Sequence, residues 1–261
     1  MWGWNARDQY TIPSFAAAEL QRRGIMDVEV VNFGQGSYTL SQELITLLLE
    51  LRRGAVPAAV VFLDGNNEVA TAFQSGQPGK IFGQATYEVR FAESPRGLVV
   101  DAMSLGRYSQ LISRLARAMG VQTVIRPARP DANAVCPEVV SYYRNLVAVG
   151  EALGRTNHFP VVFLWQPLLA NTSKPLTPWE RAASADPAYI AMLRRCTGVA
   201  DSLLDDRRGV TYFPLHDLFD QDSATVFIDQ YGHITEDANR KVADFIVDRI
   251  QPWLASSNPE P

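Results

Sequence analysis

Hydrophobic and polar residues alternate along this chain with two different periods, and each period predicts one kind of element. Apolar residues spaced three and four apart predict amphipathic helices that bury one face. Helices are expected in these ranges: 11–24, 40–51, 139–153, 187–204, and a last one whose apolar stripe runs from 242 to 253. Short runs of apolar and β-branched residues predict buried strands. Strands are expected in these ranges: 27–33, 58–63, 160–165 and 210–214.

The order of these elements predicts the fold class. Strands that alternate with helices form βαβ units, so we expect an α/β fold with a parallel sheet covered by helices on both faces. In such a sheet, ligands bind at the carboxyl ends of the strands. Three segments meet that condition: the turn after Phe33, the turn after Leu63, and the loop from Asp229 to His233.

The periodic pattern weakens between residues 72 and 137. Turn-forming sequences such as Ser75–Gly79 and Arg126–Pro130 interrupt it. We interpret residues 72–137 as an insertion or a lid-like region within a single domain that spans residues 1–255. The polar, proline-containing tail at 256–261 is expected to be frayed.

Composition and charge narrow the range of partners and cofactors. The chain has 24 Lys and Arg against 28 Asp and Glu residues, and the net charge of −4 favours neither nucleic acid nor an anionic membrane surface. Its most apolar run, Leu44–Leu51, is too short to cross a bilayer. Cys136 and Cys196 are expected to be ordinary buried residues, not a disulfide framework. The cysteines and the three histidines show no metal-ligand spacing, so no metal or other cofactor is expected.

The sharpest chemical signal is the pair of Asp229 and His233 just before the last helix. A carboxylate close to a histidine can orient the imidazole through one ring nitrogen, and the other nitrogen can then take a proton from a hydroxyl. The alternative is that His233 only begins the helix and Asp229 only forms a turn.

Two further segments carry candidate chemistry. Gly65–Glu68 follows a buried strand, and the amide of Asn67 could donate to an oxyanion there, although simple turn formation is the alternative. Gly34–Ser37 follows another strand, and backbone N–H groups in such a turn can face an anion. This turn does not complete a dinucleotide-binding motif, because Thr39 stands where the third glycine is required.

Together these segments resemble the conserved blocks of the SGNH (GDSL) hydrolase family, in its bacterial branch. Val30–Thr39 is similar to the family's second block, which ends in an oxyanion glycine. Gly65–Glu68 is similar to the third block, Gly-x-Asn-Asp, and Asp229 with His233 resembles the fifth block, Asp-x-x-His. The blocks occur in the family's order, and the resemblance runs from about Met1 to Trp253.

The resemblance implies a flavodoxin-like three-layer α/β/α sandwich and hydrolysis of acyl esters, acetyl esters included, by a Ser-His-Asp mechanism. His233 would act as general base and then acid, and Asp229 would fix its tautomer. Asn67 and a backbone N–H near Ser37 would hold the oxyanion. The substrate would be a small-molecule or carbohydrate acyl ester. Two alternatives stay open: a non-catalytic glycan- or ligand-binding descendant of the fold, and an O-acyltransferase that uses the same site.

Three departures from the family pattern lie within the blocks. Ser37 replaces the second-block glycine, which adds a Cβ where a positive φ is required, at a cost of roughly 1–2 kcal/mol. Glu68 replaces the usual aspartate of the third block. Asp229 and His233 are four residues apart and not three, so Asp220 and Asp222 stay open as alternative carboxylates.

The largest departure concerns the nucleophile. In the family, a buried strand that ends in Gly-x-Ser precedes the helix expected at 11–24, and it lies between the strands expected at 27–33 and 58–63. No such serine precedes that helix here. Without this first strand, two apolar strand edges would keep unpaired backbone groups, which is costly. We therefore expect Met1 to be an internal methionine of a longer reading frame, with the nucleophile upstream.

Overall fold

The centre of the structure is the strand β2 (Val161–Trp165), all of whose residues are buried. It pairs in parallel with β1 (Val60–Asp64) on one side and with β3 (Tyr212–Pro214) on the other. These positions come from a computed structural model that describes residues 6–84, 129–184, 186–204 and 212–256. The expected α/β fold with a parallel sheet is confirmed.

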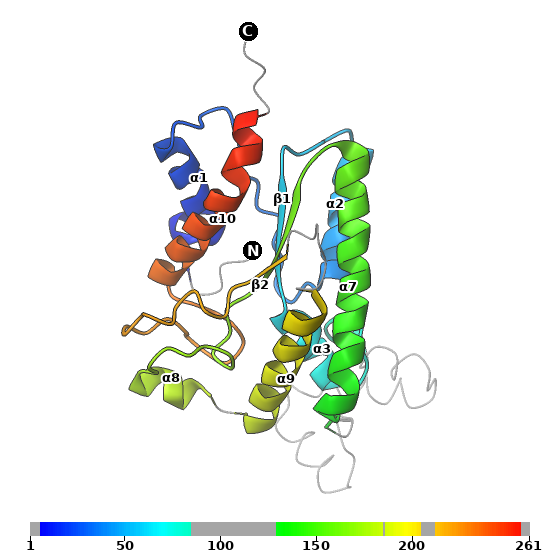
Figure 1. The fold of residues 1–261 in the computed structure, drawn as a ribbon, viewed down its shortest axis with the longest axis vertical. Helices are drawn as coiled ribbons and strands as arrows, with labels where there is room; N and C mark the ends of the chain where they lie inside the picture. Colours follow the sequence, from blue (N-terminus) through cyan, green and yellow to red (C-terminus); the bar gives the residue numbers. More distant parts are fainter. Residues whose placement is uncertain (1–5, 85–128, 185, 205–211, 257–261) are drawn as a thin grey trace, which may run out of the picture.

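Helices cover both faces of this sheet and give the molecule three layers (Figure 1). One layer holds α1 (Ile12–Arg22) and α10 (Glu236–Ser256). The other layer holds α2 (Leu40–Arg52), α3 (Asn66–Ser75), α7 (Ala132–Asn157) and α9 (Pro187–Leu204). Two short helices complete the described elements: η1 (Asp8–Tyr10) and α8 (Pro178–Ala183).

The alternation of side chains along β2 explains why two helical layers are needed. Phe163 and Trp165 belong to the core that contains α7 and α9, whereas Val162 and Leu164 belong to the core that contains α1 and α10. Successive side chains of a strand point to opposite faces, so an apolar strand buries all of them only between two layers.

All five of the expected helices are present, and capping residues explain where two of them begin. Thr11 caps α1 and accepts the Ser14 N–H at 3.4 Å. Helix α7 begins well before the expected residue 139, because the Asp131 side chain caps it by accepting the Asn133 N–H at 3.0 Å. The helices α3 and α8 were not expected from the apolar pattern.

The strand expected at 27–33 is absent, and this prediction was wrong. Val28 and Val30 pack against the core of α1 and α10, but Val31 and Phe33 are 57% and 49% exposed. Within the described residues, β1 pairs only with β2, so the other edge of β1 is open. A strand needs a neighbour to satisfy its backbone groups, and the neighbour expected between 27–33 and β1 is not among the described strands.

The two cysteines form a disulfide, contrary to the expectation from their number and spacing. Cys136 of α7 and Cys196 of α9 are both buried and are bonded to each other. They are 60 residues apart in the sequence, and the packing of α7 against α9 brings them together. Such a bond restricts the unfolded chain and so stabilises the layer that contains both helices.

Both ends of the insertion expected at 72–137 belong to helices, because α3 continues to Ser75 and α7 starts at Ala132. The middle of that region, residues 85–128, lies outside the described residues, as does the tail at 257–261. No helix in the described part of the chain is both long enough and apolar enough to span a bilayer.

Candidate active site

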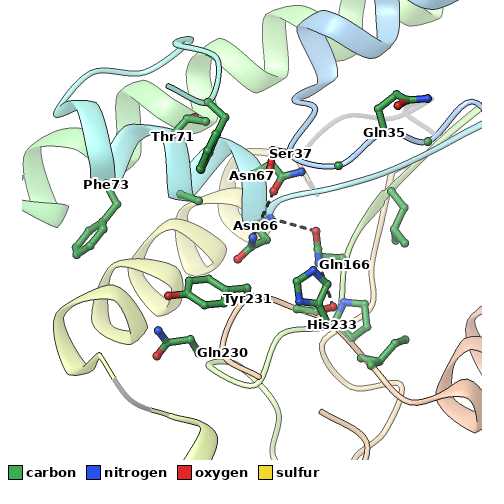
Figure 2. Close-up of a pocket in the computed structure, with 18 of the residues that line it drawn as sticks. Gln35, Ser37, Asn66, Asn67, Thr71, Phe73, Gln166, Gln230, Tyr231 and His233 are labelled. Carbon is green, nitrogen blue, oxygen red and sulfur yellow. Dashed lines mark hydrogen bonds between the residues drawn. The ribbon is translucent and has the colours of Figure 1, made fainter. Parts of the chain in front are cut away.

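The three segments singled out in the sequence meet at one cavity, at the carboxyl ends of β1 and β2 (Figure 2). The cavity has a volume of about 550 Å³. Its walls include the turn at 34–37, the first turns of α3, Gln166 after β2, and the loop at 230–234. Figure 2 shows His233 beside Gln166, with Asn67 at the start of α3.

His233 and Asp229 are in direct contact. His233 Nδ1 lies 2.6 Å from Asp229 Oδ2. The other carboxylate oxygen accepts the backbone N–H groups of Tyr231 at 2.8 Å and of His233 at 3.4 Å. Gly232 lets the loop close over the four-residue spacing, because its φ of 83° is a conformation that glycine adopts without strain. The carboxylate thus orients the imidazole through Nδ1, and proton exchange with a bound molecule falls to Nε2.

The Asp229 carboxyl group is held in its charged form. Burial alone would raise its pKa, but hydrogen bonds from His233 and from backbone N–H groups outweigh burial and lower the pKa. The two alternative carboxylates are engaged elsewhere. Asp222 pairs with Lys241 at 2.5 Å, and Asp220 accepts a backbone N–H at 3.1 Å. The structure therefore brings His233 together with Asp229.

Asn67 lies in the first turn of α3, at the cavity wall. Its Nδ2 donates to the Tyr38 carbonyl at 2.7 Å, which ties α3 to the turn at 34–37. An amide nitrogen carries two N–H groups, so this bond uses one and the second can point toward a ligand. Gly65 fixes the entry to α3, because its φ is 119° and a Cβ there would lie 2.8 Å from the Trp165 ring.

Ser37 also lines the cavity, next to the residue whose carbonyl holds Asn67. Its φ of 64° lies in the left-handed region, as its glycine-like position predicted. That conformation costs a residue with a Cβ about 1–2 kcal/mol. Ser37 is the only serine among the described residues that line the cavity. Asn67 and Ser37 therefore line the same cavity as His233 (Figure 2).

Glu68 joins the helices behind this wall. Its two carboxylate oxygens accept the Gly65 N–H at 2.9 Å and the Leu40 N–H at 2.8 Å, so the starts of α3 and α2 are fastened together. Burial raises the pKa of Glu68, although the two backbone hydrogen bonds act in the opposite direction. The Glu68 side chain thus supports the cavity wall by holding the starts of α2 and α3 together.

Two further acids adjoin Glu68, and the sequence analysis did not single them out. Asp64, at the end of β1, is buried and lies beside Glu43 of α2, which lines the cavity. Burial, reinforced by the neighbouring carboxylates, raises the pKa of Asp64 well above its ordinary value. Burial and the charge of Glu68 raise the pKa of Glu43 to about 7. These acids therefore hold protons at pH values where ordinary carboxyl groups have lost them.

Gln166 connects helix α3 with the loop that carries His233. The sequence analysis did not predict this role. Its Oε1 accepts the Asn66 N–H at 3.3 Å, and its Nε2 donates to the Gly232 carbonyl at 3.5 Å. Tyr189 of α9 donates to Asn66 Oδ1 at 2.6 Å. One side chain at the end of β2 thereby links helix α3 with the histidine loop.

Comparisons with known proteins give a likeness among solved structures. No family model matches the chain, and no curated protein matches it. Among solved structures, the chain is similar to the crystal structure of an acetyl xylan esterase, AlAXEase. The two chains are 12% identical, the likeness covers 92% of this chain and 91% of the other, and the TM-score is 0.48.

Proposed function

We propose that this protein hydrolyses acyl esters, acetyl esters included, by the serine-esterase mechanism of the SGNH (GDSL) family. The observation that carries the proposal is the 2.6 Å contact between His233 Nδ1 and Asp229 Oδ2, at the wall of the cavity that Asn67 also lines. An oriented histidine and a neutral amide donor that face one space are two of the parts that acyl transfer requires. The third part is a nucleophile.

In this mechanism a serine Oγ attacks the acyl carbon while His233 Nε2 takes the serine proton. The π electron pair of the carbonyl moves onto its oxygen. The resulting oxyanion accepts hydrogen bonds from Asn67 Nδ2 and from the backbone N–H of Ser37. Collapse expels the alkoxide, which takes the proton back from His233. Water then attacks the acyl-enzyme in the same way, so that the acid leaves and the serine is regenerated. Asp229 stays ionised throughout and stabilises the imidazolium.

We further propose that the nucleophile is carried by a strand upstream of residue 1 that pairs with the open edge of β1. That edge has no strand partner among the described residues. Residues 27–33 have the composition of a strand, but they do not pair with any described strand. A strand between them would satisfy backbone groups on both sides. Its carboxyl end would reach the cavity, because the carboxyl ends of parallel strands meet at one edge of the sheet.

The test is an esterase assay on a protein extended upstream along its own reading frame. The extended protein should hydrolyse p-nitrophenyl acetate, and His233→Ala should lower kcat by at least about 10³-fold. His216→Ala is the matched control and should keep activity, because His216 also lies near carboxylates but does not line the cavity.

Three outcomes would overturn the proposal. The first is that no in-frame strand ending in Gly-x-Ser precedes residue 1. The second is that the extended protein is inactive; if it then still binds a glycan, the non-catalytic binding module is favoured. The third is that the two histidine variants lose activity equally.

A further inference from the structure

The cavity wall has a chemical character that the catalytic groups do not account for. Amide side chains are prominent on it, among them those of Gln35, Asn67, Gln74, Gln166 and Gln230. Aromatic rings line it as well: Phe73, Phe82, Tyr189 and Tyr231. The described lining residues include no lysine or arginine.

Three of the rings form a row along the wall. The ring centroids of Phe73 and Tyr189 lie 5.2 Å apart, and those of Tyr189 and Tyr231 lie 5.5 Å apart. Tyr189 is buried and supports its neighbours, whereas Tyr231 is 49% exposed. A tyrosine ring that is packed on one side and exposed on the other offers a firm apolar surface to a ligand.

The charge of the wall argues against an anionic ligand. Binding of a carboxylate or phosphate ordinarily uses Arg or Lys, and the acids on this wall are Glu43 and Asp186. The guanidinium of Arg129 pairs with Asp186 at 3.8 Å. An anionic ligand would therefore find no lysine or arginine among the described lining residues to offset the cost of its transfer out of water.

The amides fit groups that both donate and accept hydrogen bonds. Each Gln or Asn side chain offers a carbonyl oxygen and two N–H groups without a net charge, and a hydroxyl group offers and accepts in the same way. Gln35 and Gln74 are exposed, so their amides can be turned toward a ligand. A sugar ring combines such hydroxyls with an apolar C–H face, which matches amides and aromatic rings on one wall.

We propose that the cavity binds the sugar of a neutral glycan, with Tyr231 as the stacking platform and Gln35 and Gln74 as partners for its hydroxyls. The inference rests on the proposed function for the reaction itself, and it identifies the acyl carrier as an uncharged sugar. A uronic-acid polymer is not expected as the main ligand, because the described wall has no lysine or arginine.

Calorimetric titration of the protein with xylohexaose, cellohexaose and mannohexaose tests this inference, with oligogalacturonate as the charged comparison. At least one neutral hexamer should bind more tightly than oligogalacturonate. Tyr231→Ala should weaken that binding by at least about fivefold, because an exposed apolar contact is lost. Tyr142→Ala is the matched control, since Tyr142 is 40% exposed and does not line the cavity. Thermal melts of both variants check that they remain folded.

The inference is overturned if no neutral hexamer binds, if oligogalacturonate binds more tightly, or if Tyr231→Ala binds like Tyr142→Ala. Binding needs neither the serine nor proton transfer, so it can be measured whether or not the protein has esterase activity. Glycan binding without esterase activity would therefore refute the proposed function and leave this inference standing. Esterase activity without glycan binding would refute this inference and leave the proposed function standing.

Discussion

Lys174 Nζ lies 2.7 Å from Glu180 Oε2, and both side chains are completely buried. The other oxygen of Glu180 accepts the N–H groups of Val226 at 2.9 Å and Phe227 at 3.1 Å. These two residues lie just before Asp229 in the chain, so the ion pair fastens the segment that carries the acid–histidine contact. Burial would raise the pKa of Glu180, but these partners outweigh it and lower the pKa to about 2.

Removal of the cation should therefore unfold the protein more easily. Lys174→Met leaves a buried carboxylate without its partner, and we expect a loss of about 3–5 kcal/mol in the free energy of unfolding, measured by urea denaturation. Arg53→Ala breaks an exposed ion pair with Glu50 and should cost at most about 1 kcal/mol. Equal losses for the two variants would show that Glu180 is not held as described.

Gly65→Ala should be much more harmful than the same change at Gly76. At Gly65 the φ is 119° and a Cβ would lie 2.8 Å from the Trp165 ring, so strain and overpacking together should cost roughly 3 kcal/mol. Gly76 has a φ of 73° with nothing within 4 Å of a Cβ, so only the backbone strain of about 1 kcal/mol is expected there. Thermal or urea melts of the two variants decide this, and similar losses would contradict it.

The buried acids predict how stability depends on pH. The pKa of Glu43 is raised to about 7, so the folded state binds more protons than the unfolded state between the ordinary value of 4.5 and that value. The stability this gives is complete below the ordinary pKa and is lost as the pH rises through about 7. Asp229 and Glu180 have lowered pKa values, so their ionisation changes the stability of the protein only at more acidic pH.

We therefore expect the free energy of unfolding to fall by about 1–2 kcal/mol between roughly pH 5 and 8. Glu43→Gln should remove much of this fall, because the amide does not ionise. Glu50→Gln, on the same helix, should keep it. A profile that Glu43→Gln leaves unchanged would exclude Glu43 as the source.

The sequence predicted those features that depend on local pattern. Strand β2 and helix α9 follow from an uninterrupted apolar run and from a clean helical period. The segment 27–33 has the same kind of pattern as β2, yet whether it forms a strand depends on a neighbour that it must pair with. The bond between Cys136 and Cys196 depends on the packing of two helices, which sequence spacing does not reveal.

The candidate site also contains residues that local sequence predicts and residues that only the folded structure brings together. Asp229 and His233 are close in sequence, so their contact could be expected. Gln166 directly follows an expected strand, but its role appears only when the ends of β1 and β2 lie side by side. Glu43 is one of the two acids of α2, and only its place beside Asp64 sets it apart.

Asn67→Ala tests the oxyanion role in the upstream-extended protein. Loss of one oxyanion donor should lower kcat by about 10²–10³-fold, while KM for p-nitrophenyl acetate changes little. Asn133→Ala, at an exposed position at the start of α7, is the matched control and should leave kcat unchanged. A rise in KM with unchanged kcat would assign Asn67 to substrate binding alone.

The most direct test of the central claim is labelling of the upstream-extended protein with a fluorophosphonate, followed by mass spectrometry of its peptides. An activated serine Oγ displaces fluoride and becomes phosphonylated, and its proton passes to the histidine. We predict one adduct, on a serine upstream of residue 1, that is lost in His233→Ala and retained in His216→Ala. Absence of an adduct, or an adduct on Ser37 or on another serine within residues 1–261, would contradict the account.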